Sequence, residues 1–99
     1  MYTDFHHADF EWDFDKDVEN QLKHGVSFET ARIAFYDPKR IVLEDLNHSR
    51  VEKRLYCIGS VRDGILTVRF TLRKELVRII GAGYWRKGKS IYEKENQIH

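Results

Sequence analysis

The chain has 99 residues, of which 41% are hydrophobic and 13% aromatic, enough to bury one core but not two. One proline and six glycines exclude a linker-rich or disordered chain, and a single cysteine excludes an internal disulfide or a cysteine zinc cluster. The sequence has neither an apolar run of about 18 residues nor the basic and apolar regions of a signal peptide. These features predict one cytoplasmic domain over residues 1–99, with flexible ends at 1–7 and 95–99.

The net charge of +1 hides an uneven distribution along the chain. Residues 1–49 hold 5 Lys or Arg and 11 Asp or Glu, whereas residues 50–99 hold 12 Lys or Arg and 5 Asp or Glu. A basic half of this kind predicts a surface that faces a polyanion such as RNA. The alternative is that the two halves neutralise each other across the fold.

The first forty residues predict a strand followed by two helices. Residues 8–13 alternate between apolar and acidic side chains, which indicates a short strand at a sheet edge. Residues 15–24 are typical of a helix in which Val18 and Leu22 face the core and Asn20 faces outward. A second helix has an apolar stripe formed by Phe28, Ala31, Ile33, Ala34 and Phe35.

Capping residues mark the ends of both helices. Asp13 or Asp15 caps the first helix, and Gly25 supplies the left-handed position that ends it. Ser27 caps the second helix, and Asp37-Pro38 stops it.

From residue 40 the apolar period changes to two, which predicts strands. The expected strands are 41–43, 53–61, 65–73 and 76–82, with a hairpin turn at 62–64 and a helix over 85–96. Gly88 lies inside that helix and weakens it by about 1 kcal/mol relative to Ala. Together these elements predict an α+β fold with a short N-terminal strand, two helices, an antiparallel β-meander of about four strands and a C-terminal helix.

One face of the predicted sheet is rich in arginine. Leu66, Val68, Phe70 and Leu72 form the face that the two helices cover, and the opposite face is expected to be free. That free face carries Arg69, Arg73, Arg78 and Arg54, close enough across antiparallel strands to bind phosphate oxygens together. The alternative is an ordinary solvated face in which these arginines pair with Glu44, Asp45, Glu52 and Glu75.

Several short motifs point to one family when they are taken together. They are Phe10-Glu11-Trp12-Asp13, Asn20, Lys23-His24-Gly25-Val26-Ser27-Phe28, Ala31, Phe35, Asp37-Pro38, His48-Ser49, Glu52, Arg54, Ile58-Gly59 and Arg78-Ile79-Ile80. In this combination the chain resembles the BrnT toxins, which are small bacterial ribonucleases of RelE-like fold encoded beside a neutralising antitoxin. The resemblance therefore implies a RelE-like fold and a toxin of a type II toxin–antitoxin system.

The resemblance also implies an activity, a site and a partner. The activity is metal-independent endoribonuclease cleavage that inhibits translation, with no cofactor and no metal site. The catalytic candidates are His48, Arg54, Arg73 and Arg78, and the RNA- or phosphate-binding candidates are Lys23, His24, Arg69, Arg86 and Lys87. The implied partner is a DNA-binding ribbon-helix-helix antitoxin, through which alone the toxin reaches DNA; no membrane is involved.

Some of these residues also have a structural interpretation. His48 can order the backbone of its loop, Glu52 can hold Arg54 or act as a base, and Lys23-His24 can complete a helix end. Residues 84–92 mix aromatic and basic side chains, which suits either stacking on RNA bases or a helix docked through Trp85 and Tyr92.

The chain departs from the family pattern after Arg78-Ile79-Ile80. Common members have Ser-Ala-Arg where this chain has Gly81-Ala82-Gly83, and they have a Glu where it has Gly88. Arg86, Lys87 and Lys89 are nearby replacements for the missing charge. The departure keeps two other functions open: a non-catalytic module that binds RNA or an acidic partner, and a structural protein whose charges drive assembly.

Overall fold

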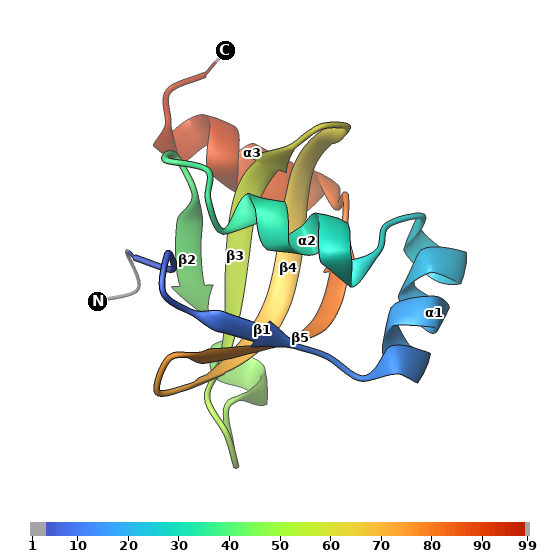
Figure 1. Cartoon of the computed structure of the whole chain (residues 1–99). Helices are drawn as coiled ribbons and strands as arrows, with labels where there is room; N and C mark the ends of the chain where they lie inside the picture. Colours follow the sequence, from blue (N-terminus) through green and yellow to red (C-terminus); the bar gives the residue numbers. More distant parts are fainter. Residues whose placement is uncertain (1–3, 99) are drawn as a thin grey trace.

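The computed structural model describes residues 4–98, and they form the predicted α+β fold (Figure 1). In chain order the elements are β1 (Asp9–Glu11), α1 (Phe14–His24), α2 (Phe28–Ala34), β2 (Ile41–Glu44), the 3₁₀ helix η1 (Leu46–His48), β3 (Arg54–Val61), β4 (Gly64–Arg73), β5 (Leu76–Gly83) and α3 (Arg86–Glu95). No helix among these residues is long and apolar enough to cross a membrane.

A single five-stranded sheet organises the fold, with strand order β1-β5-β4-β3-β2. Strands β2 to β5 pair antiparallel with their neighbours in sequence, as in the predicted meander. Strand β1 adds to the far edge, parallel to β5, with Phe10 opposite Val77 and Glu11 opposite Arg78. This pairing brings an acidic residue from the start of the chain onto the arginine-rich face.

The predicted capping residues are confirmed. The Asp13 carboxylate accepts a hydrogen bond from the Lys16 N–H at 3.1 Å, and Gly25 ends α1 with a φ of 69°. The Ser27 hydroxyl accepts from the Thr30 N–H at 3.1 Å and caps α2. These signals are local, so they determine where the helices begin and end whatever the rest of the chain does.

The core lies between α2 and one face of the sheet, and α2 crosses in front of that face in Figure 1. Phe35 is the centre of an aromatic cluster, with ring centroids 5.0 Å from Phe5, 5.1 Å from Phe10 and 5.0 Å from Phe70. Phe5 is 3% exposed and belongs to this cluster, although it lies within residues 1–7, for which a flexible start was expected. The remainder of that expectation includes residues 1–3, which lie outside the described part of the chain.

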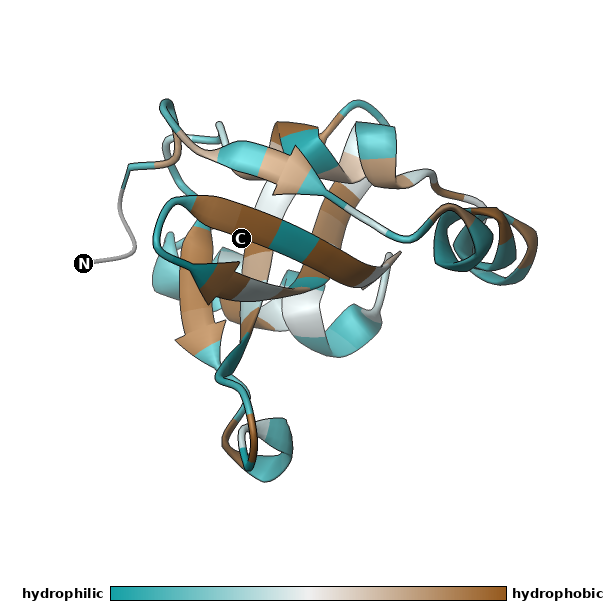
Figure 2. Ribbon diagram, turned by 60° about the horizontal axis from the view of Figure 1, so that its bottom comes forward, coloured by the Kyte–Doolittle hydropathy of each residue, from teal (hydrophilic) through white to brown (hydrophobic). Residues whose placement is uncertain are grey.

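The predicted orientation of α1 is wrong. Val18 is 39% and Leu22 83% exposed, whereas Asn20, predicted to face outward, is 7% exposed. Helix α1 lies beside the sheet rather than on it, and Asn20 holds it there through hydrogen bonds to Val26 and to both backbone groups of Ala82. The apolar residues of α1 consequently face solvent, and brown segments on this helix mark them at the edge of the molecule in Figure 2.

The sheet face opposite α2 is not wholly free, because α3 packs on it behind β3 and β4 (Figure 1). A Cβ atom at position 88 would collide with the Thr67 side chain, so Gly88 allows this close approach and is required by packing. Tyr92 is buried in the contact and donates its hydroxyl hydrogen bond to Asp37 at 2.6 Å. The C-terminal helix thus covers the Thr67 part of the face and leaves the part around Arg54 and Arg78 accessible.

Candidate functional site

Three of the predicted catalytic residues meet at one end of the open sheet face, and we refer to Arg54, Arg73 and Arg78 as the arginine cluster. Arg54 of β3 is opposite Thr71 of β4, and Thr71 is opposite Arg78 of β5. Neighbouring strands are about 4.8 Å apart, so the two arginines flank Thr71, and Arg73 follows two residues along β4. Thr71 is 4% exposed, and its Oγ1 has no hydrogen-bond partner among residues 4–98.

Carboxylates hold two members of the arginine cluster in place. Arg73 donates two hydrogen bonds to Glu52, at 2.7 and 3.0 Å, and Arg78 donates one to Glu11 at 2.9 Å. The hydrogen bonds from Arg73 keep the pKa of Glu52 below its ordinary value, with the nearby charges of Arg54 and Arg78 adding to the effect. Glu52 is therefore an ionised salt-bridge partner, as expected from the sequence, and its partner is Arg73 rather than Arg54.

Within the described residues Arg54 forms no ion pair, and neither does Arg69. Of the pairings expected for a solvated face, the structure therefore has Arg73 with Glu52, whereas Arg78 pairs with Glu11, which was not among the expected partners. An uncompensated guanidinium beside two compensated ones leaves excess positive charge on the face, which suits an anionic ligand.

His48 is the last residue of η1, in a loop that the chain closes against the backbone of Arg54. The Ser49 hydroxyl donates to the Asp45 carbonyl at 2.6 Å and accepts from the Arg54 N–H at 3.0 Å. The Asp45 N–H in turn donates to the Arg54 carbonyl at 2.8 Å. These bonds fix the loop against the start of β3, so they explain why a His-Ser pair precedes Arg54 in the sequence.

A buried carboxylate orients the His48 ring. Asp45 is 6% exposed, and its Oδ2 lies 2.9 Å from His48 Nδ1 and 3.1 Å from the Tyr56 hydroxyl, which donates to it. Burial by itself raises the pKa of Asp45, but the hydrogen bonds from His48 and Tyr56 outweigh it and hold that pKa below its ordinary value. An ionised carboxylate only accepts, so Nδ1 carries the proton and Nε2 is left to exchange a proton with a ligand.

Asp45 and Tyr56 were given no role in the predicted site, although Tyr56 was expected on the same sheet face as Arg54. Burial, followed by the hydrogen bond to Asp45, raises the pKa of Tyr56, so this hydroxyl remains protonated and continues to donate. The three-residue spacing of Asp45 and His48 in a polar loop was the available sequence signal. Tyr56 needed the strand register, which places it opposite Arg69 on the same face.

A second group of predicted residues lines a groove between α1 and β5, which we call the α1 groove. Its volume is about 260 Å³, and its walls are Lys16, Glu19, Asn20, Lys23, His24, Arg69, Ile80, Gly81 and Trp85. Lys23, His24 and Arg69, predicted as RNA-binding residues from distant parts of the chain, therefore share one site. Arg69 also belongs to the open sheet face, so it connects the groove to the arginine cluster.

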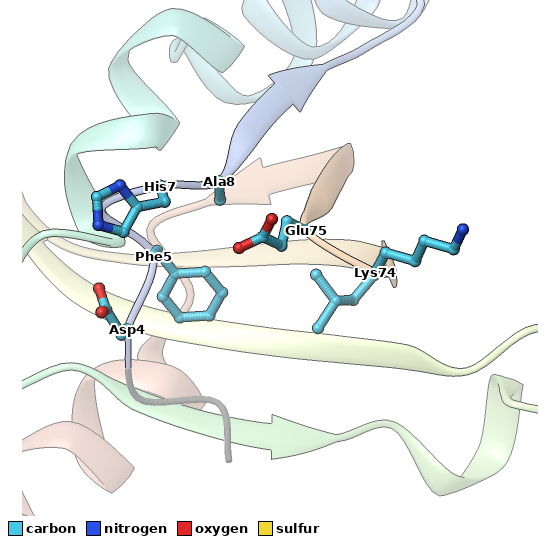
Figure 3. A pocket seen from close by; sticks show the side chains of 7 residues that line it. Asp4, Phe5, His7, Ala8, Lys74 and Glu75 are labelled. Atoms are coloured by element: carbon cyan, nitrogen blue, oxygen red, sulfur yellow. The ribbon is translucent and has the colours of Figure 1, made fainter.

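Arg86 and Lys87 join neither group. Both are exposed at the start of α3, beyond the end of β5 that is remote from Arg78. Another hollow, of about 200 Å³, lies between the N-terminal segment and the β4–β5 turn (Figure 3). Phe5 and Leu72 line that hollow from the core side of the sheet, and Lys74 extends away from it. It is thus unconnected with the arginine cluster.

Among residues 4–98 no three His, Cys, Asp or Glu side chains are grouped as metal ligands. The side chains of the arginine cluster and of His48 can stabilise negative charge and transfer protons.

Comparison with known proteins identifies the family. The model of the ribonuclease toxin BrnT of type II toxin–antitoxin systems matches residues 12–88. No curated protein matches the chain. The family match spans most of the sequence and includes every predicted site residue, so the chain belongs to the BrnT toxin family, as the sequence motifs predicted.

Proposed function

We propose that this member of the BrnT family is a metal-independent endoribonuclease that acts in the cytoplasm and inhibits translation. The family is one of ribonuclease toxins that have a cognate antitoxin. The arrangement that carries the proposal is the pairing of the arginine cluster with a histidine whose Nδ1 is held by Asp45. Together these groups supply phosphate binding and proton transfer, the two requirements of RNA cleavage without a metal.

In the proposed reaction the ribose 2′-oxygen attacks the adjacent phosphorus atom and the bond to the 5′-oxygen breaks. One group removes the proton of the 2′-hydroxyl and one gives a proton to the leaving 5′-oxygen, which leaves a 2′,3′-cyclic phosphate. His48 Nε2 performs one of these transfers, and Asp45 stabilises the ring when it becomes positively charged. Arg54, Arg73 and Arg78 stabilise the extra negative charge on the phosphorane.

The carboxylate partners have a positioning role in this scheme. Glu52 and Glu11 hold the guanidiniums of Arg73 and Arg78 so that their remaining N–H groups point along the face. Lys23, His24 and Arg69 bind the RNA on one side of the scissile phosphate, and Arg86 and Lys87 add a longer-range attraction.

A non-catalytic RNA-binding module is the alternative. Two observations favour it: Glu52 and Glu11 already neutralise Arg73 and Arg78, and Gly83 replaces an arginine of the family pattern. In that case the same face binds RNA, and His48 contributes only to the order of its loop. Both functions require RNA binding, so an assay of RNA cleavage is needed to distinguish the endoribonuclease from the non-catalytic module.

The antitoxin would be a ribbon-helix-helix protein that covers the arginine cluster, and the toxin would reach DNA only as part of their complex. The exposed excess charge supports this, because an acidic segment of a partner competes with RNA for the same guanidiniums.

Controlled expression in bacteria tests the proposal. Induction of the chain should arrest growth and produce new RNA ends, whereas the double variant His48→Ala/Arg73→Ala should do neither. Arg62→Ala is the matched control, because Arg62 is exposed in the β3–β4 turn at the other end of the sheet.

The purified proteins separate enzyme from binding module. Cleavage of RNA in the presence of a chelator, lost in the double variant while RNA binding persists, supports the enzyme. RNA binding without any cleavage by well-folded protein would favour the non-catalytic module.

A further inference from the structure

The α1 groove has a size and lining suited to a single flat ring system. Its volume of about 260 Å³ is below the roughly 300–1,000 Å³ of pockets that hold drug-sized ligands. The groove opens between the last turn of α1 and an irregularity in the β4–β5 pairing next to Arg69, where Ile80 has no counterpart and Gly81 has no side chain. The bulge and the glycine together keep the space open.

Two aromatic rings form one wall of the groove. His24 and Trp85 meet with ring centroids 5.2 Å apart at an angle of 71°, and Trp85 is 37% exposed. The indole lies across the backbone of Gly83, where an added Cβ would be only 2.7 Å from its Cζ2 atom. Glycine at position 83 is therefore what allows this ring to rest against β5 with its exposed part toward the groove.

The charged residues in the rest of the lining are mainly cationic. There are three cations, Lys16, Lys23 and Arg69, and one carboxylate, Glu19, which pairs with Lys23 at 3.6 Å. Arg69 forms no ion pair among the described residues, so the groove retains positive charge beside its aromatic wall. Aromatic rings that stack on bases, combined with cations that bind the backbone, are what single-stranded nucleic acid requires.

The groove is also adjacent to the arginine cluster. Arg69 and Thr71 project from the same face of β4, about 7 Å apart for two residues of a strand. An RNA strand with one phosphate between Arg54 and Arg78 would therefore have a neighbouring nucleotide at Arg69, next to the aromatic wall.

We infer that the α1 groove is a nucleobase subsite, in which an RNA base next to the cleaved phosphate stacks on Trp85, with His24 against the edge of the stack, while Arg69 and Lys23 bind its phosphate. The inference rests on the proposed function, because it assigns the RNA as the ligand. Stacking recognises any base by its face, so the subsite gives affinity and orientation with little sequence preference.

Binding of an uncleavable RNA tests the subsite independently of catalysis. The probe is a fluorescent single-stranded oligonucleotide with 2′-fluoro sugars, which lacks the attacking hydroxyl. Trp85→Ala should weaken its binding about 10-fold, since stacking of one base on an aromatic ring is worth roughly 1–3 kcal/mol. Trp85→Phe should restore most of the affinity, and Tyr84→Ala, an equally exposed aromatic residue outside the groove, should have no effect.

A series of oligonucleotides with one abasic position each completes the test. At one position the loss of the base should weaken binding to the parent protein and should not weaken binding to Trp85→Ala any further. Unchanged affinity of a folded Trp85→Ala protein, or an equal abasic penalty in both proteins at every position, would overturn the subsite. If the parent binds the probe with these dependences and yet cleaves no natural RNA, the subsite stands and the catalytic proposal fails.

Discussion

Asn20 should contribute more to stability than any apolar residue of α1. Its Nδ2 donates to the carbonyls of Val26 and Ala82 at 2.9 Å each, and its Oδ1 accepts from the Ala82 N–H at 3.1 Å. Replacement by Ala leaves these buried backbone groups without partners, at about 1–3 kcal/mol for each unsatisfied group if no water replaces the side chain. Partial relaxation limits the sum to about 3–4 kcal/mol, and the better helix propensity of Ala returns up to about 0.7 kcal/mol.

The expected net destabilisation by Asn20→Ala is thus about 2–3 kcal/mol, which corresponds to a fall in Tm of roughly 10–20 °C for a domain of this size. Leu22→Ala is the matched control on the same helix, because Leu22 is 83% exposed and its truncation should change stability by less than about 0.5 kcal/mol. Urea and thermal unfolding followed by circular dichroism measure both variants. If the two proteins unfold within about 0.5 kcal/mol of each other, the assignment of Asn20 as the attachment of α1 is incorrect.

Four further predictions concern the site and its supports. His48→Ala should lower the rate of RNA cleavage about 10²–10⁴-fold in a protein that remains folded, and a change of less than threefold in single-turnover assays would contradict its role. Cleavage by the parent protein should persist in a chelator, and recovery only on added divalent ions would contradict a metal-independent reaction. Gly83→Arg should displace the Trp85 ring and change the near-ultraviolet circular dichroism, whereas adding Trp85→Ala should relieve the strain in unfolding experiments. Burial raises the pKa of Asp37, but hydrogen bonds from Tyr92 and from two backbone N–H groups outweigh it and keep the pKa below its ordinary value. A lowered folded-state pKa gives stability that is full above the unfolded value and is lost as pH falls. The excess stability of the parent over Asp37→Asn should therefore shrink on acidification below about pH 4, and a constant difference down to pH 2 would contradict this.

The parts of the fold that were predictable depend on short-range interactions. Asp13 and Ser27 cap their helices through N–H groups three residues ahead. Gly25 adopts its left-handed conformation because glycine has no Cβ atom. The alternation of residues 65–73 between two faces likewise follows from strand geometry alone. Such features are specified by a few neighbouring residues, so one sequence is enough to find them.

The orientation of α1 and the contact of α3 were not predictable in this way. Hydrophobic period turns Val18 and Leu22 inward, but α1 is attached by a polar side chain to a residue 62 positions away. Gly88 has an unfavourable intrinsic helix propensity. It is nevertheless favoured here because a larger residue would collide with the Thr67 side chain of β4. In both cases a tertiary contact outweighs a local preference.

In the candidate site, too, some features could be predicted from the sequence and others could not. Basic residues at alternating positions predicted the arginine cluster, because one face of a strand collects every second side chain. Their partners come from 21 and 67 residues away, Glu52 for Arg73 and Glu11 for Arg78, and the latter depends on parallel pairing of β1 with β5. Long-range register of this kind is not encoded in any local pattern.

Gly83, which stands where the family pattern has an arginine, affects the proposed roles of the α1 groove and the arginine cluster. In this chain the space that a side chain at position 83 would enter is filled by the Trp85 indole, so an aromatic surface stands where the family pattern has a cation. Under the proposed function, Arg54, Arg73 and Arg78 bind the scissile phosphate at the other end of β5. The proposed nucleobase subsite then places a stacking surface, instead of a further cation, beside the neighbouring nucleotide. On these two proposals, Gly83 changes how the chain holds that nucleotide and leaves the proposed cleavage groups in place.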